Sequence, residues 1–120
     1  MRGRERGMVR DRRTRNRFMR LMVFFDLPVV SKDDRAIYTR FRKFLIEDGY
    51  DMLQFSVYCR IVNGEDSVDK HLNRLKKALP PKGSVRFLQI TDKQYAAMKI
   101  LVGTRTKKEK TLDSRQTLLF

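Results

Sequence analysis

Tryptophan is absent from this 120-residue chain, and cysteine and histidine each occur once. The single cysteine, Cys59, excludes an intramolecular disulfide. It is one of the alternating apolar residues of a predicted strand, so we expect it in the core. The single histidine, His71, is far in sequence from any acid cluster, so we expect a surface or boundary side chain rather than a metal ligand. No apolar run approaches the roughly 18 residues that span a bilayer, and no apolar signal segment precedes the first predicted strand. These absences predict a cytoplasmic protein that binds no membrane.

Sequence motifs for nucleotide and metal binding are missing as well. The chain contains no glycine-rich phosphate loop, no GxGxxG and no CxxC. Any chemistry must therefore come from individual acidic and basic side chains.

Positive charge is abundant. Lysine and arginine number 28 against 14 acids, a formal net charge of +14 that predicts a polyanionic partner, nucleic acid first of all. Residues 1–20 carry nine arginines against Glu5 and Asp11. We predict that residues 1–17 form a flexible basic arm that contacts phosphates through Arg12, Arg13, Arg15 and Arg17. The alternative is that this arm has no specific role and that Met19 is the real start.

Asp26 is the strongest candidate for chemistry. It is the only carboxylate between Asp11 and Asp33, and it ends an apolar run typical of a buried strand. A charge is costly there unless it faces a polar site or a cation. The alternative is that Asp26 caps a turn before Pro28 by accepting backbone N–H bonds. One carboxylate holds Mg²⁺ poorly, but a two-fold dimer would bring two copies of Asp26 together.

Hydrophobic periodicity predicts a strand over residues 18–27 and then a helix. Ser31 and Asp34 have the spacing of a capping box that opens this helix, and Gly49 suits the position just past its end. The predicted apolar face consists of Ile37, Tyr38, Phe41, Phe44 and Leu45. The remaining faces carry five cations: Lys32, Arg35, Arg40, Arg42 and Lys43.

The apolar run over residues 52–62 has two interpretations. It is either one long strand or two short antiparallel strands that reverse at residues 54–56, and periodicity does not decide between them. A second helix follows, capped by Asp66 or Ser67 and stopped by two prolines. Its predicted apolar face consists of Val68, Leu72, Leu75 and Leu79.

A strand over residues 84–90 and a short helix complete a predicted domain over residues 18–103. Thr91 and Gln94 form a second capping box. We expect this helix to pack through Tyr95, Met98 and Ile100. If the middle run is a hairpin, the order βαββαβ predicts a ferredoxin-like α/β (α+β) sandwich, an antiparallel sheet with two helices on one face.

Residues 104–120 are predicted to form a basic linker and a docking strand. The chain's last three residues, Leu118, Leu119 and Phe120, are apolar. Such residues are poorly placed unless they add a strand to a sheet edge or dock on a partner. The alternative is a frayed tail.

Five segments form a pattern more specific than any single motif. They are Met22 to Pro28 (MVFFDLP), Tyr38 to Leu45 (YTRFRKFL), Gly49-Tyr50, Gln54 to Tyr58 (QFSVY) and Thr91 to Tyr95 (TDKQY). In order and spacing, over residues 18–120, they resemble the small CRISPR-associated adaptation protein family, "Cas two", most closely its type II variant. The arginine-rich residues 1–17 depart from the usual start of that family.

The resemblance implies a two-fold homodimer that bridges two dimers of the larger "Cas one" integrase and holds the double-stranded DNA that becomes a new spacer. It places the hairpin reversal at residues 54–56. It also implies a C-terminal strand that crosses to the dimer mate and helps to recruit the integrase, a role that Leu118, Leu119 and Phe120 fit. By position in the family, the cations nearest the duplex are Lys32, Arg35, Lys76 and Lys77.

Two functions remain open at this point. The favoured one is a structural DNA-binding subunit that contacts phosphates without reading bases. The alternative, also described for the family, is a metal-dependent endonuclease for RNA or double-stranded DNA, with paired Asp26 side chains as the catalytic Mg²⁺ ligands. No second acid is spaced to share a site with Asp26, which favours the structural role, and Asp33 and Asp34 suit a first helical turn. A ferredoxin-like RNA-cleaving toxin is a third possibility, which the type II-like motifs disfavour.

Overall fold

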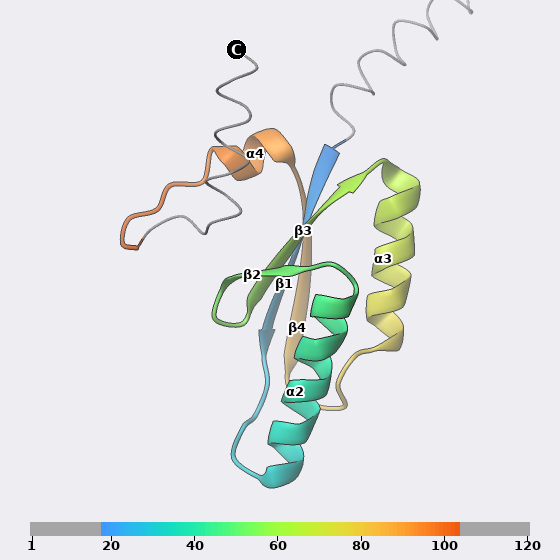
Figure 1. Cartoon of the computed structure of the whole chain (residues 1–120), viewed down its shortest axis with the longest axis vertical. Coiled ribbons are helices and arrows are strands. Elements are labelled where there is room, and N and C mark those ends of the chain that lie inside the picture. The colour runs from blue at the N-terminus through green and yellow to red at the C-terminus, as the bar shows by residue number, and fades with distance from the viewer. Residues whose placement is uncertain (1–17, 104–120) are drawn as a thin grey trace, which may run out of the picture.

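The computed structural model describes residues 18–103, so the predicted arm and docking strand lie outside the described residues. Four strands and three helices follow one another along this part of the chain (Figure 1). They are β1 (Phe18–Asp26), α2 (Lys32–Glu47), β2 (Asp51–Gln54), β3 (Val57–Asn63), α3 (Glu65–Lys77), β4 (Ser84–Thr91) and α4 (Asp92–Ala96). Among residues 18–103, no helix is long and apolar enough to cross a membrane.

The sheet confirms the predicted ferredoxin-like α+β sandwich. Its strand order is β2-β3-β1-β4, and each neighbouring pair is antiparallel. β1 is therefore a central strand, paired with β3 on one side and β4 on the other. Residues 21–25 are apolar on both faces, because Leu21 and Val23 face the core formed with the long helices while Met22 and Phe24 face a second apolar cluster on the other side.

The run over residues 52–62 is a hairpin and not one long strand. β2 and β3 pair in antiparallel register, and Gln54 lies opposite Val57. The reversal is made by Phe55 and Ser56, and Ser56 adopts a φ of 63°, a left-handed conformation that is uncommon outside glycine. The Phe25 amide donates to the Ser56 carbonyl over 3.1 Å, which ties the turn to the end of β1.

The two faces of the sheet are covered differently. Side chains of β1 that point to one face, such as Leu21 and Val23, join a core with Phe41 of α2 and Leu75 of α3. Both long helices therefore cover this face, as Figure 1 shows. On the opposite face, Met22 and Cys59 pack only against Tyr95 of the short helix α4 and a few half-buried residues. The buried position of Cys59 confirms the sequence prediction.

Both predicted capping boxes are present. The Ser31 hydroxyl accepts from the Asp34 amide over 3.0 Å and the Asp34 carboxylate accepts in return from the Ser31 amide. Thr91 and Gln94 make the same reciprocal pair at the start of α4. These local contacts satisfy amides that a helix N-terminus leaves without a partner.

The boundaries of α3 differ from those predicted. Its N-cap is Gly64, with no side-chain cap, so neither Asp66 nor Ser67 has that role. The helix ends at Lys77, and Leu79 lies beyond it with 48% of its surface exposed. The predicted apolar face was therefore wrong at Leu79, because the chain leaves the helical path before reaching that residue.

The last helix is also shorter than predicted. α4 ends at Ala96, and only Tyr95 of its three expected packing residues is buried. Met98 and Ile100 lie past the helix and are exposed. The Arg20 guanidinium lies 4.1 Å from the Tyr95 ring centre and pairs with Asp92, which holds α4 against β1.

Candidate functional site

Asp26 is the last residue of β1 and is exposed to solvent. It lies opposite Ser84 of β4. Because strand side chains alternate between faces, Asp26 shares the face opposite the two long helices with Met22 and Phe24. The backbone of Asp26 lies very close to Gly83, since a Cβ atom added to Gly83 would lie 2.7 Å from the Asp26 carbonyl oxygen.

The carboxylate of Asp26 has no hydrogen bond or ion pair within residues 18–103. The turn-capping alternative for Asp26 therefore finds no support. An exposed carboxylate at a strand end is a suitable oxygen donor for hydrated Mg²⁺, which takes one or two protein ligands together with substrate phosphates. Asp26 could hold such an ion only with a second ligand from another copy or from a nucleic acid.

Asp34 and Asp92, two other acids of the described residues, are engaged elsewhere. Asp34 caps α2 and lies 3.5 Å from Lys82, and Asp92 pairs with Arg20 at 2.8 Å. The Ser31 amide, aided by the Ser31 hydroxyl and Lys82, holds the pKa of Asp34 below its ordinary value of 3.8. Residues 18–103 contain no group of three or more histidine, cysteine or acidic side chains able to hold a metal.

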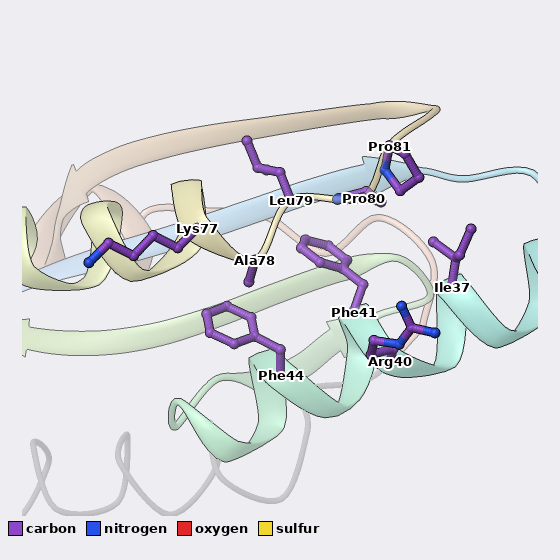
Figure 2. A pocket seen from close by; sticks show the side chains of 9 residues that line it. All are labelled: Ile37, Arg40, Phe41, Phe44, Lys77, Ala78, Leu79, Pro80 and Pro81. Atoms are coloured by element: carbon purple, nitrogen blue, oxygen red, sulfur yellow. The ribbon is translucent and has the colours of Figure 1, made fainter.

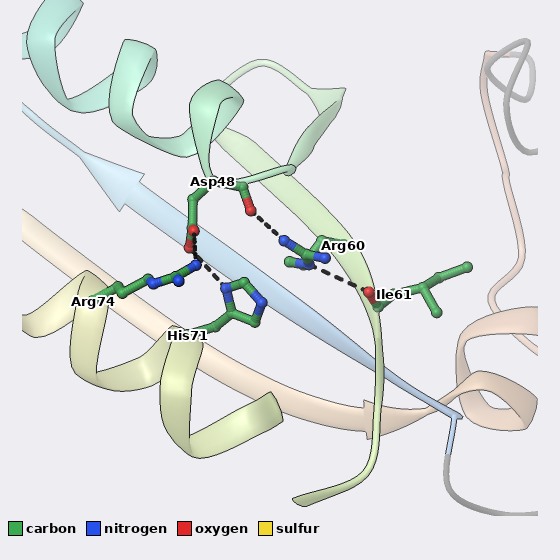
Figure 3. Close-up of polar contacts among 5 residues, drawn as sticks. All are labelled: Asp48, Arg60, Ile61, His71 and Arg74. Atoms are coloured by element: carbon green, nitrogen blue, oxygen red, sulfur yellow. Dashed lines mark hydrogen bonds and ion pairs between the residues drawn. The ribbon is translucent and has the colours of Figure 1, made fainter. Parts of the chain in front are cut away.

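His71 is buried, so the predicted surface or boundary position was wrong. Its Nδ1 atom lies 2.8 Å from the carboxylate of Asp48, which also accepts from Arg74 over 2.9 Å (Figure 3). The side chains of Asp48 and His71 are only 8% and 5% exposed. The Arg60 guanidinium donates to the Asp48 carbonyl, so four residues from α3, β3 and the end of α2 meet there.

This network is a structural connection between the helices. Asp48 caps the C-terminal end of α2, while His71 and Arg74 belong to α3. Tyr50 packs edge-on against the His71 ring, and its buried hydroxyl has no hydrogen-bond partner within the described part of the chain. Burial, together with the Asp48 charge, raises the pKa of Tyr50 to about 12. Since His71 is almost fully enclosed, it is not positioned to act on a substrate.

The predicted DNA-contacting cations that lie in the described residues are exposed: Lys32, Arg35, Lys76 and Lys77. Arg35 also stabilises the β1–α2 connection, because its guanidinium donates to the Val30 carbonyl over 3.0 Å. Lys32 and Arg35 lie in the first turn of α2, whereas Lys76 and Lys77 lie in the last turn of α3. Lys77 also lines a groove together with Arg40, a cation that was not selected from the sequence as a DNA contact.

That groove, about 270 Å³ in volume, lies between α2 and the connection from α3 to β4 (Figure 2). Its lining is mainly apolar: Ile37, Phe41, Phe44, Ala78, Leu79, Pro80 and Pro81. Arg40 and Lys77 are its charged members, and it contains no acid. The groove therefore lacks the carboxylates that metal-dependent hydrolysis would need.

Comparison with known proteins agrees with this fold. The family described as CRISPR associated protein Cas2 matches residues 19–98. A relative from Acidovorax ebreus, strain TPSY, named CRISPR-associated endoribonuclease Cas2, is 59% identical over 102 residues, covering 85% of this chain and all of the relative. A relative of the same name from Campylobacter jejuni is 43% identical over 105 residues, 88% of this chain and 73% of its own length.

A third relative of that name, from Treponema denticola, is 41% identical over 101 residues, covering 84% of this chain and 100% of its own length. A solved structure described as the crystal structure of cas2 matches 75% of this chain and 91% of its own, with a TM-score of 0.52 and 21% identity, which supports the fold alone. Both the family match and the relatives cover the sheet, the two long helices and Asp26. The chain belongs to the Cas2 family of CRISPR-associated proteins.

Proposed function

We propose that this chain is a structural DNA-binding subunit of the CRISPR spacer-acquisition complex. In this role a homodimer bridges two dimers of the larger integrase and holds a duplex for integration into the CRISPR array during antiviral defence. Family membership supports the proposal. The observation that carries it is the net charge of +14, which suits contact with the phosphates of a duplex. Asp26 is an exposed carboxylate that belongs to no metal-binding cluster within residues 18–103.

The sheet face opposite the two long helices supports the proposed dimer. Phe24, Val57 and Ile90 are only half-buried on this face, and Leu88 is 46% exposed. Apolar side chains that stay partly exposed on a sheet face are a common site of protein contact. Asp26 lies on the same face, so a two-fold contact there would bring two Asp26 side chains toward each other.

A second candidate function is a Mg²⁺-dependent endonuclease for RNA or double-stranded DNA. The relatives carry the name endoribonuclease, and Asp26 is exposed with no internal partner. In this alternative, two Asp26 carboxylates bind Mg²⁺ across the dimer. When bound, the ion would activate water and offset the charge that develops on the phosphate.

The remaining parts of the proposal concern residues outside the described range. Arg12, Arg13, Arg15 and Arg17 would contact duplex phosphates, and Leu118, Leu119 and Phe120 would dock on the integrase. Charge removal at the four arginines should weaken binding equally for unrelated sequences and flatten its dependence on salt. A change in sequence preference would contradict phosphate-only contact. We place the complex in the cytoplasm, where the CRISPR array is located.

The test is integration of a short duplex into a plasmid that carries a CRISPR repeat. The purified protein is combined with its cognate integrase and compared with Asp26→Asn, with a deletion of residues 116–120, and with Asp69→Ala. Asp69 is an exposed acid on α3 and serves as the charge-matched control. The structural role predicts normal integration by Asp26→Asn and Asp69→Ala, and loss of integration in the truncated chain.

Loss of integration in Asp26→Asn, with the dimer intact by sedimentation, would overturn the purely structural role. The endonuclease is tested separately with labelled RNA and duplex DNA, with Mg²⁺ or with EDTA. Cleavage that needs both Mg²⁺ and Asp26 would establish the second candidate. Cleavage that persists in Asp26→Asn would exclude Asp26 as its metal ligand.

A further inference from the structure

The turn between β2 and β3 presents an aromatic ring to solvent. Phe55 is 78% exposed, although phenylalanine is among the residues most often buried. Its ring stacks on Tyr38 of α2, with ring centres 6.3 Å apart and an interplanar angle of 23°. One face of Phe55 is thus supported by Tyr38, while most of the ring remains accessible.

This exposed ring is held in place by the fold. Tyr38 packs edge-on against Phe25, with ring centres 5.7 Å apart, and Phe25 is a buried core residue. The neighbouring Ser56 adopts its φ of 63°, and its carbonyl accepts from the Phe25 amide. A positive φ is unfavourable for serine, and such backbone conformations persist mainly where the surrounding structure holds them in place, often at functional sites. The turn therefore fixes Phe55 with little freedom to collapse onto the surface.

Cations flank the aromatic pair along α2. Arg35 and Arg42 lie three residues before and four residues after Tyr38, which places them one helical turn away on the same side. Both are exposed, and Arg42 makes no ion pair within the described part of the chain. An aromatic platform between basic side chains is the arrangement with which proteins bind single-stranded nucleic acids, through base stacking and phosphate contact.

We propose that Phe55, supported by Tyr38, forms a stacking site for an unpaired nucleobase, with Arg42 contacting an adjacent phosphate. The site lies at the same end of the sheet as Asp26, since the Phe25 amide joins β1 to the turn. A base within a duplex is already stacked on its neighbours and offers no free face to this ring. The inference rests on the nucleic-acid binding proposed above and adds a preference for unpaired nucleotides at this turn.

The test measures the anisotropy of a fluorescein-labelled 12-nucleotide single strand and of the matched duplex over a range of salt concentrations. The variants are Phe55→Leu, which keeps apolar bulk but removes the aromatic ring, Phe55→Tyr, which keeps the ring, and Arg42→Gln. Met52→Ala is the control, because Met52 is an exposed apolar residue of β2 outside the turn.

Phe55→Leu should weaken single-strand binding at least fivefold, because stacking is worth about 1 to 3 kcal/mol per base. The salt dependence should stay unchanged in this variant, whereas Arg42→Gln should reduce its slope by about 0.7. Phe55→Tyr and Met52→Ala should bind like the parent chain, and duplex binding should be unaffected by Phe55→Leu.

Equal single-strand affinity for Phe55→Leu and the parent chain would overturn the stacking site. A parallel loss of duplex and single-strand binding would also overturn it, because that pattern indicates a general disturbance. If Phe55→Leu left nucleic-acid binding intact but prevented assembly with the integrase, the ring would be a protein contact and the inference would be wrong. Failure of the parent chain to bind duplex DNA would instead contradict the proposed structural function.

Discussion

Removal of the Asp48 carboxylate should cost a large fraction of the stability of this domain. The change is Asp48→Ala, which leaves the backbone acceptor for Arg60 in place and removes the two side-chain bonds. The bond to His71 lies in an enclosed site, where a charge-assisted hydrogen bond contributes about 1.5 to 3 kcal/mol. The bond to Arg74 contributes less, about 0 to 1 kcal/mol, because half of the Arg74 side chain faces water.

The free energy of unfolding should therefore fall by about 1.5 to 4 kcal/mol in Asp48→Ala, out of the 5 to 15 kcal/mol that is usual for a domain. Urea unfolding at pH 7 measures this, with an unchanged m-value as the sign that the transition stays two-state. Arg74→Ala should cost less than about 1 kcal/mol and Asp69→Ala less than about 0.5 kcal/mol. A loss below about 1 kcal/mol for Asp48→Ala, or an equal loss for Arg74→Ala, would refute this account of the network.

Two further changes test the surroundings of this network and of Asp26. The Tyr50 hydroxyl has a pKa raised to about 12 from an ordinary 10.0, so its contribution to stability is complete below pH 10 and is lost as the pH rises toward 12. Relative to Tyr50→Phe, the parent chain should lose about 2 to 3 kcal/mol over that interval in urea unfolding, and parallel pH curves would contradict this. Gly83→Ala should destabilise the domain by at least about 1 kcal/mol more than Gly64→Ala, because both glycines have a φ of 91° but only Gly83 has the Asp26 backbone within 3 Å of an added Cβ. Equal thermal midpoints for the two alanine variants would show that the close approach to Asp26 has no energetic consequence.

Local sequence signals predicted the elements that depend on near neighbours. The capping boxes at Ser31 and Thr91 are present because their hydrogen bonds join residues only three positions apart. The first strand followed from its continuous apolar run, and the core position of Cys59 followed from the alternation of apolar residues in its own strand. The helix ends were less predictable. α3 begins after Gly64 without a side-chain cap, and the chain leaves the helix before Leu79.

The sequence by itself determined the basic character of the chain, the prominence of Asp26 and the order of the elements, apart from the choice between one strand and a hairpin over residues 52–62. Tertiary structure decided which polar groups meet. It buried His71 against an acid 23 positions away, and it left the Asp26 carboxylate without a partner inside residues 18–103. The stacking of the exposed Phe55 ring on Tyr38 depends on the position of the hairpin turn beside α2. The physical reason is range: periodicity and caps act over three or four residues, whereas these contacts depend on how the sheet and helices bring distant segments together.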